Sequence, residues 1–434
     1  MNRSTSLISI FAVLGTASAV HATSARVESM GKHDTYFMDD ISVWSNPANA
    51  NIYPNYLMGE LGQMRQNGII TSGSAFQRYN QDPQAPWFGA IFAKSFSADP
   101  NSGNRYPQVV VGGALNRRDD LLDFMPSQVV LTYAGRNGAG TDKIDSVLTL
   151  QPAAVKADFL VGYAAANGAL YGAKLYIARS DTSSTQAFEA SSTLWATTIG
   201  INYPIAQGLD FEAALTAAGI DAAATSGSYA YRSNSDVSIL GSARAFISVP
   251  EIAGEVVPAI KFRQIDGPGI ENDMSVTAGS GVNVSLDRGF FWIGADYSRT
   301  STEKRLLNGV VSDWDSLPLR TYDANTVRVS FGIERNVWWD WFVLRVGGQK
   351  VFTAAEENWK DKSAPVSIST TDIVTNPEGD GSINDCISFG FGLNIEDKLK
   401  VDAVVAEDIL FTGGNLLGGP ADHVLTRISS TYSF

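Results

Sequence analysis

The sequence has few of the residues that build disulfides, metal sites and catalytic centres. It contains one cysteine and three histidines. No disulfide can form within the chain, and we expect Cys386 to be an ordinary small residue at the start of a strand. Gly-x-Ser-x-Gly and His-Glu-x-x-His patterns are absent, which removes common hydrolase and zinc-protease signatures. We therefore predict that the chain is not an enzyme and binds no cofactor and no metal.

Long apolar runs and excess positive charge are also missing. Beyond the N-terminus no 18 consecutive residues are apolar, which argues against a membrane-spanning helix. Lys and Arg number 32 against 45 Asp and Glu, a net charge of −13, so nucleic acid is not an expected partner. The pairs Asp119-Asp120 and Glu356-Glu357 are predicted to be solvated loop residues. Asp313 and Asp315, which flank Trp314, are weaker candidates for binding a cation or a sugar.

The N-terminus has the layout of a secretory signal. Arg3 precedes an apolar stretch over residues 7–15, and small residues follow. This order predicts a signal peptide over residues 1–22, cleaved after Ala19 or, as we favour, after Ala22. A membrane-anchoring helix is the alternative, but the apolar stretch is shorter than the roughly 20 residues that such a helix needs.

Much of the remaining chain alternates apolar and polar residues with a period of two. Within residues 327–334, valine, phenylalanine and isoleucine alternate with Arg328, Ser330, Gly332 and Glu334. The pattern recurs at residues 275–286, 290–299 and 387–396. Successive strand side chains point to opposite faces, so these segments are predicted strands with one apolar face. Several run for 10–13 residues, closer to the roughly 9–11 of a membrane strand than to the roughly 5–6 of a soluble sandwich.

The connections between these strands alternate between short and long. Short joins fall at residues 167–168, 204–208, 250–254, 287–289, 335–340 and 396–398, and longer ones at 180–192, 218–236, 266–274, 301–322, 353–385 and 411–421. Transmembrane barrels have short periplasmic turns and longer extracellular loops. We therefore predict an all-β fold, a transmembrane antiparallel β-barrel of about 14–16 strands over residues 56–434, with a first strand at 56–64. Residues 129–131 and 147–150 are left open as strands, loop hairpins or short helices.

The C-terminus fits such a barrel. A last strand is predicted from about His423 to Phe434, with Val424, Ile428, Tyr432 and Phe434 on one face. The terminal aromatic pair Tyr432 and Phe434 resembles the assembly signal of outer-membrane barrels, which implies the barrel-assembly machinery and outer-membrane lipid as partners. Aromatic residues expected at strand ends form an interfacial girdle; they are Trp195, Tyr203, Trp338, Trp339, Trp341 and Tyr432.

The segment before the first strand carries a family resemblance. Residues 23–55 contain Met30-Gly31, then Asp39-Asp40, then Asn46-Pro47-Ala48. This order resembles the opening segment of the long-chain fatty-acid transporter (FadL-like) barrels and their type IX secretion-associated (PorV-like) relatives. The resemblance covers about 40 residues. Lys32 stands where the family usually has a second glycine, and family members usually have 14 strands.

The resemblance implies that residues 23–55 form a hatch in the barrel lumen. Pro47 fixes its own φ and biases Asn46 away from helix. Buried Asp39 and Asp40 need partners, and the expected ones are the inward-facing cations Arg244, Lys261, Arg263 and Arg328. Glu334 is the fifth predicted lumenal charge, and Gly31, Asn46, Pro47 and Ala48 complete the predicted hatch site. The alternative is an N-terminal tail tucked against the periplasmic rim.

Three functions remain open at this point. The first is passive transport of hydrophobic or amphipathic small molecules through a plugged lumen in the cell outer membrane. The second is a non-transporting surface scaffold that holds secretion-system proteins, which the long joins at 301–322 and 353–385 motivate. The third is a general porin with a loop folded inward.

Overall fold

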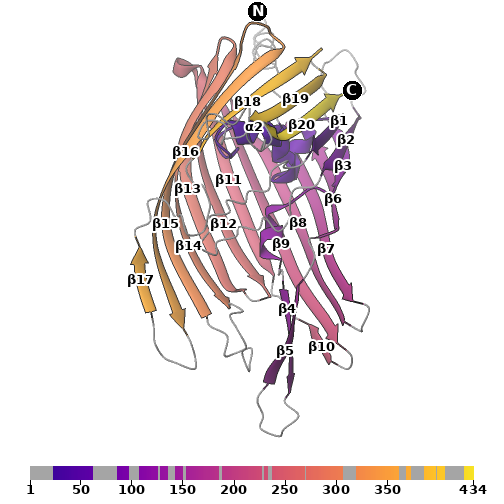
Figure 1. The fold of residues 1–434 in the computed structure, drawn as a ribbon. Helices are drawn as coiled ribbons and strands as arrows, with labels where there is room; N and C mark the ends of the chain where they lie inside the picture. Colours follow the sequence, from indigo (N-terminus) through magenta and orange to yellow (C-terminus); the bar gives the residue numbers. More distant parts are fainter. Residues whose placement is uncertain are drawn as a thin grey trace, which may run out of the picture.

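Sixteen antiparallel strands close into a β-barrel in the computed structural model (Figure 1). The structure describes residues 23–61, 86–96, 107–125, 128–134, 142–149, 153–184, 188–226, 229–232, 237–268, 270–305, 319–360, 368–372, 386–396, 398–405 and 425–434. Neighbours in sequence pair around the ring, and the first and last strands close it through pairs from Tyr56–Ser433 to Leu61–Ile428. The fold class predicted from alternation is confirmed. The predicted signal at 1–22 lies outside the described residues, as do His423, Asp313 and Asp315.

The barrel strands have the following bounds. They are β1 (Tyr56–Leu61), β2 (Trp87–Ser95), β3 (Gln108–Leu115), β6 (Val155–Ala164), β7 (Leu170–Ser184), β8 (Phe188–Ala206), β9 (Leu209–Ser226), β11 (Ser238–Val249), β12 (Gly254–Gly267), β13 (Ile270–Leu286), β14 (Gly289–Arg305), β15 (Leu319–Asn336), β16 (Phe342–Lys360), β18 (Cys386–Ile395), β19 (Leu399–Val405) and β20 (Leu425–Ser433). Two further strands, β10 (Tyr229–Arg232) and β17 (Ile368–Asp372), extend the sheet beside β9 and β16.

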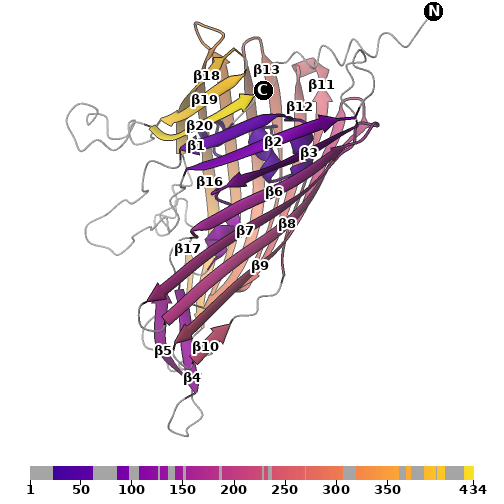
Figure 2. The same ribbon diagram turned by 90° about the vertical axis from the view of Figure 1, so that its right-hand side faces the viewer.

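The wall of the barrel is uneven in height. Strands β7–β9 and β13–β16 have 15 to 19 residues, whereas β18–β20 and β1–β3 have 6 to 10. Figure 2 shows the short strands as a low wall beside the long, steeply descending β7–β9. We call the first group the tall wall and the second the low wall.

The two ends of the barrel differ in their connections. Short turns such as 207–208, 287–288 and 337–341 gather at one end, here the turn end. Phe434 lies there too, because its N–H donates to the Asn55 carbonyl at the start of β1. The β3–β6 connection at the other end, the loop end, carries a hairpin of β4 (Gln128–Ala134) and β5 (Asp142–Thr149) beyond the strand ends (Figure 1). This resolves the open assignment of 129–131 and 147–149 as a loop hairpin outside the ring, and Leu150 lies outside the described residues.

Two joins predicted to be long are mostly strand. Strand β7 continues to Ser184 and β8 begins at Phe188, while β12 ends at Gly267 and β13 begins at Ile270. Alternation stops before these strands do, since both faces become polar where a strand leaves the apolar layer. Backbone pairing continues regardless, because the hydrogen bonds of a ladder do not depend on side-chain polarity.

The faces of the strands follow the alternation. In β15 the apolar Val329 and Phe331 are exposed on the outside, whereas Ser330 and Glu334 are buried inside. The girdle aromatics Trp338, Trp339 and Trp341 are exposed at a turn-end connection. Trp195 differs from expectation, because β8 begins earlier than predicted and places this residue within the strand. No helix in the described part of the chain is long and apolar enough to cross a membrane.

Candidate lumenal site

Residues 23–55, which we call the hatch, fold into three short helices. They are α2 (Ser24–Ser29), η1 (Asp40–Trp44) and η2 (Pro47–Asn51). Each begins at a capping side chain: Thr23 accepts from the Arg26 N–H, Asp39 from Ile41, and Asn46 from Ala48. Such caps satisfy backbone donors that the first turn leaves free. The residues singled out at Asp39 and Asn46 therefore set the local fold of the hatch.

The hatch lies against the inner face of the barrel. The Asn46 amide donates to the Ile201 carbonyl at 3.2 Å, and the Gln108 amide donates to the Asn51 carbonyl at 2.8 Å. Residues Pro47 and Ala48 are buried. These contacts with β3 and β8 place the segment against the inner face of the barrel, as the hatch hypothesis expects.

Glycines on the inner face make room for the hatch backbone. A Cβ atom at Gly172 would stand 2.2 Å from the Pro47 carbonyl carbon, and one at Gly200 would stand 2.0 Å from Asn46 Oδ1. A Cβ at Gly347 would stand 2.3 Å from the Gly31 nitrogen. Glycine inside a strand often marks such close backbone approach. The small residues on the polar strand faces were the sequence signal for these seats.

Gly31 sits where the hatch crosses β15 and β16. Its φ is +99°, and an added Cβ would lie 2.8 Å from the Phe331 carbonyl oxygen. Lys32 follows with φ of +68°, a left-handed conformation that favours glycine.

A buried ion network fixes α2 to β15. The Arg26 guanidinium donates to both Glu334 oxygens, at 2.6 and 2.7 Å, and to Asp39 Oδ2 at 3.2 Å. Arg345 donates to Glu334 at 3.0 Å and to Asp402 at 2.6 Å. These side chains are at most 4% exposed, so water does not screen their charges.

The predicted partners of Asp39 were therefore wrong. Its ion-pair partner is Arg26 of the hatch itself, 13 residues earlier, and not one of the four predicted wall cations. Burial raises the pKa of Asp39 to about 6, although the nearby Arg26 acts in the opposite direction. Burial, and then the charge of Asp39, raises the pKa of Asp40 well above its ordinary value. A protonated Asp40 beside an ionised Asp39 is the arrangement that this buried pair favours.

Two of the predicted wall cations bind the hatch elsewhere. Arg244 Nη1 donates to the carbonyls of Asp34, Thr35 and Phe37 at 2.8–3.1 Å. Lys261 Nζ donates to Thr35 Oγ1 at 2.8 Å. These two side chains hold the turn between α2 and η1 against β11 and β12.

The other two wall cations pair with acidic residues of the wall. Arg263 binds Asp273 at 2.7 Å and Arg328 binds Asp296 at 2.9 Å. Sequence reasoning missed Arg26, Arg345, Asp402 and Glu212, which accepts from Arg244 at 2.8 Å. Three of these face inward on their strands, so strict alternation through β9, β16 and β19 was the signal that identifies them.

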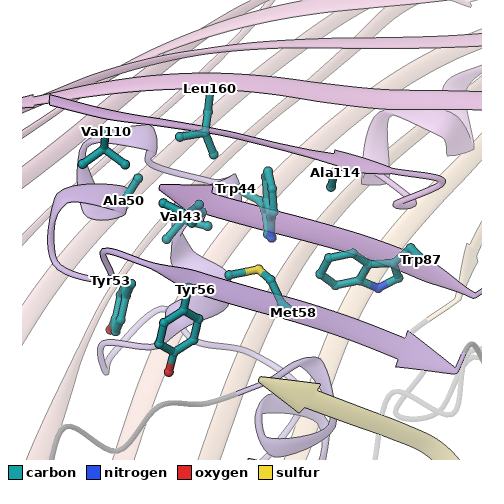
Figure 3. Packing of buried hydrophobic residues seen from close by; sticks show 11 residues of the cluster. Val43, Trp44, Ala50, Tyr53, Tyr56, Met58, Trp87, Val110, Ala114 and Leu160 are labelled. Carbon is teal, nitrogen blue, oxygen red and sulfur yellow. The ribbon is translucent and has the colours of Figure 1, made fainter. Parts of the chain in front are cut away.

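Apolar packing joins the other side of the hatch to the low wall. Val43, Trp44 and Tyr53 are buried against Met58 of β1 and Trp87 of β2. Figure 3 shows these side chains gathered between the hatch and the strands. The Trp44 and Trp87 rings meet edge to face at 6.1 Å, a favoured aromatic geometry. The hatch thus has a charged attachment to β15–β19 and an apolar one to β1–β6.

A second segment enters the lumen from the loop end. Residues 116–125, here the inward loop, follow β3 and contain η3 (Asp120–Phe124), which Asp119 caps. Leu121 and Leu122 are buried against inner-face residues of the tall wall and of β12, including Tyr176, Leu194, Ile220 and, on β12, Ile265. The porin hypothesis also expected a loop folded inward. In this barrel the inward loop lies on the loop-end side of the hatch.

The inward loop also corrects a prediction about Asp119. It is not a solvated surface residue: Asp119 binds Arg117 at 2.8 Å and Lys174 at 3.5 Å. Burial raises the pKa of Asp119, but Lys174 and Arg117 outweigh this and hold the pKa below its ordinary value. Its neighbour Asp120 is exposed, as predicted.

A cavity of about 840 Å³ lies between the hatch and the inward loop. Ile41 and Trp44 of the hatch and Leu121 and Phe124 of the inward loop supply apolar lining, and Lys261 is a cationic lining residue. Further charged side chains, among them Arg117, Asp119, Lys174 and Arg263, also line the cavity, together with wall hydroxyls; the hydroxyls are those of Thr198, Thr216, Ser242, Ser275 and Thr277. Within the described ranges no group of three His, Cys, Asp or Glu residues is arranged to hold a metal ion. The cavity has the mixed character that suits an amphipathic small molecule.

Comparisons with known proteins find only solved structures of low similarity. No protein-family model and no curated protein matches the sequence. Among solved structures, CdiB from Escherichia coli matches at 10% identity and a TM-score of 0.36, over 87% of this chain and 63% of CdiB. BamA from Haemophilus ducreyi lacking POTRA domains 1–3 matches at 6% identity and a TM-score of 0.36, over 87% of this chain and 69% of that BamA chain. The TodX monoaromatic hydrocarbon channel deltaS2 mutant matches at 12% identity and a TM-score of 0.34, over 95% of this chain and 97% of the TodX chain.

This chain spans less than two thirds of the length of CdiB.

Proposed function

We propose that this chain is an outer-membrane barrel that carries hydrophobic or amphipathic small molecules passively through a lumen plugged by the hatch. The observation that carries the proposal is the pair of segments in the lumen, since the hatch from the turn end and the inward loop from the loop end both line a cavity of about 840 Å³. In the proposed route, a ligand passes both segments. The proposed transport is therefore a sequence of small movements and not flow through an open pore.

The outer surface supports the membrane location. Ile293, Val329 and Phe331 are exposed on the outside of adjacent strands, while charged residues such as Glu334 and Asp296 are buried inside. A charge facing the bilayer midplane costs about 2–4 kcal/mol, so this sorting suits a lipid-facing wall. The predicted signal peptide over residues 1–22 agrees with export.

The hatch supports kinship with the FadL-like and PorV-like barrels. Gly31 and Asn46-Pro47-Ala48 all make the close inner-wall contacts that a plug requires. The sixteen strands depart from the usual 14 of that family. We propose the kinship at the level of a plugged barrel and not of a specific cargo.

The expected partners follow from this reading. They are outer-membrane lipid, hydrophobic small molecules, and the assembly machinery acting on the terminal strand. Tyr432 and Phe434, the proposed assembly signal, are exposed and stack at 6.5 Å. We propose no catalytic activity.

Uptake into proteoliposomes tests the transport proposal. Radiolabelled oleate and labelled toluene are supplied outside vesicles containing the intact chain, a variant lacking residues 23–55, or no protein. We expect energy-independent uptake by the intact chain above that of empty vesicles, with conductance in planar bilayers close to background. Uptake equal to that of empty vesicles for both ligands would contradict the transport proposal. Large steady single-channel currents from the intact chain would contradict a plugged lumen.

A scaffold role is the second candidate, favoured by the β4–β5 hairpin that projects beyond the barrel at the loop end (Figure 1). In-cell cross-linking from residues of this hairpin, followed by mass spectrometry, separates the two functions. A surface protein cross-linked in stoichiometric yield favours the scaffold, whereas lipid alone favours transport.

A further inference from the structure

Arg117 is bound to three parts of the molecule at once. It belongs to the inward loop and donates to both oxygens of Asp158 on β6, at 2.8 and 2.9 Å. It also donates to Asp119 of its own loop at 2.8 Å. Its guanidinium lies over the Trp44 ring of the hatch, 5.1 Å from the ring centre, within the range of a cation–π contact.

Lys174 makes a second link between the same partners. From the inner face of β7, its ammonium donates to the Trp44 carbonyl at 2.5 Å and to Asp119 at 3.5 Å. Trp44 is 4% exposed, so both of its contacts lie in a protected site where charge-assisted bonds are strong. The inward loop and the hatch thus share one cationic junction, although they enter the barrel from opposite ends.

The inward loop covers an apolar surface. Leu121 and Leu122 pack on the buried Tyr176, Leu194 and Ile220 of the tall wall. Phe124 packs beside them, with the Arg263 guanidinium 5.0 Å from its ring centre. Lifting the loop uncovers this apolar wall, which is the surface a hydrophobic ligand would contact on its way from the loop end to the cavity.

We propose that Arg117 couples the two closures, so that the inward loop and the hatch open together. When the loop leaves the wall, Arg117 leaves with it, and Trp44 loses its cation–π contact. When the hatch moves, Lys174 and Arg117 lose Trp44 as a partner, and the loop loses part of its anchorage. Coupling of this kind is reciprocal by thermodynamic necessity. Such coupling would regulate the proposed transport function, on which this inference rests: a ligand that binds at the loop end loosens the hatch at the turn end.

Cysteine labelling measures the coupling without any transport. In a Cys386→Ser background, Ser29→Cys reports on the hatch and Leu122→Cys reports on the inward loop, since both residues are buried. The rate of reaction with N-ethylmaleimide is measured in refolded protein. We expect Arg117→Met to raise labelling at position 29, and Trp44→Leu to raise labelling at position 122, each by at least about fivefold, or about 1 kcal/mol.

The controls use residues of the same type outside the junction. Arg179→Met removes an exposed arginine that pairs with Asp181 on β7, and Trp341→Leu removes an exposed tryptophan; neither is expected to change labelling. Folding of Arg117→Met is checked by the heat-dependent gel shift of a barrel. Where that variant fails to fold, Arg117→Lys is used in its place, because it keeps the charge but loses the paired hydrogen bonds to Asp158. It is expected to give a smaller increase at both reporters.

The proposal is overturned if Arg117→Met, or Arg117→Lys in its place, speeds labelling of the loop and leaves that of the hatch within twofold. It is also overturned if the double variant Arg117→Met/Trp44→Leu gives the product of the single effects, since that result means that Arg117 does not act on the hatch through Trp44. Failure of uptake with intact coupling would count against the proposed function alone.

Discussion

Arg26 and Glu334 are separated by 308 residues in the sequence, and two hydrogen bonds of 2.6 and 2.7 Å join their side chains. The contact joins the first helix of the hatch to β15 close to the turn end of the barrel. Both side chains are 3% exposed, and Arg345 holds the same carboxylate from β16. A paired arginine–carboxylate contact of this geometry carries direction as well as energy, so it fixes how α2 lies in the lumen.

Removing one member of this pair leaves a buried charge without its partner. We expect Glu334→Gln and Arg26→Met each to weaken hatch docking by about 3–5 kcal/mol, with the barrel still folded. Limited proteolysis of the hatch in refolded protein measures the loss. The exposed Arg335, next to Glu334 on β15, provides the control Arg335→Met. Equal protease resistance of Glu334→Gln and the native chain contradicts the prediction.

Acid should strengthen the hatch and not release it. Burial raises the pKa of Asp39 to about 6 and that of Asp40 well above its ordinary value, so the docked hatch holds protons more tightly than an undocked one. Stability therefore falls as pH rises through these pKa values, by at most about tenfold in the docking constant per pH unit for each carboxyl. The labelling rate of a Ser29→Cys reporter, divided at each pH between 5 and 9 by that of an exposed cysteine to remove the titration of the thiol itself, measures this.

Asp40→Asn mimics the protonated carboxyl and should flatten the alkaline part of that profile. A hatch that opens on acidification would show that the Arg26–Asp39 ion pair, and not burial, dominates.

The glycine seats on the inner wall should not accept a methyl group. Gly172→Ala and Gly200→Ala place a Cβ atom 2.2 Å from Pro47 and 2.0 Å from Asn46, so the hatch must shift. We expect a cost of about 1–3 kcal/mol in docking and faster protease cleavage of the hatch. Gly241→Ala on β11 is the matched control, because its nearest neighbour would be 3.8 Å away. Identical cleavage of all three variants would mean that the hatch does not rest on these seats.

The outer face of β15 should behave as a lipid-facing surface. Val329→Arg places a charge in the middle of a long strand, whereas Leu286→Arg places one at the turn end of β13. We expect a loss of about 2–4 kcal/mol for the first and about 0–1 kcal/mol for the second. Urea titration of folding into lipid vesicles gives both values. Equal losses would contradict a membrane boundary near the turn end.

The local alternation of apolar and polar residues was enough to predict the barrel. Alternation in segments such as 327–334 identifies the strands and their lipid faces, because side-chain direction along a strand is fixed by backbone geometry. The Asn46-Pro47-Ala48 motif likewise predicts a capped turn, since Asn46 and Pro47 act on their own backbone. Strand ends were less readable, as the overlooked extensions of β7 and β12 show.

The pairing of charges was decided only by the tertiary structure. Whether Asp39 meets Arg26, Arg244 or Arg328 depends on how the hatch lies in the barrel. The positions of the wall cations relative to the hatch depend in turn on the pairing register of every strand in the ring. The inward loop is a similar case: Asp119 looks like a surface residue in sequence, and only the pairing of β3, β6 and β7 brings Lys174 to it. Local chemistry thus determined the wall of this protein, and long-range geometry determined what fills it.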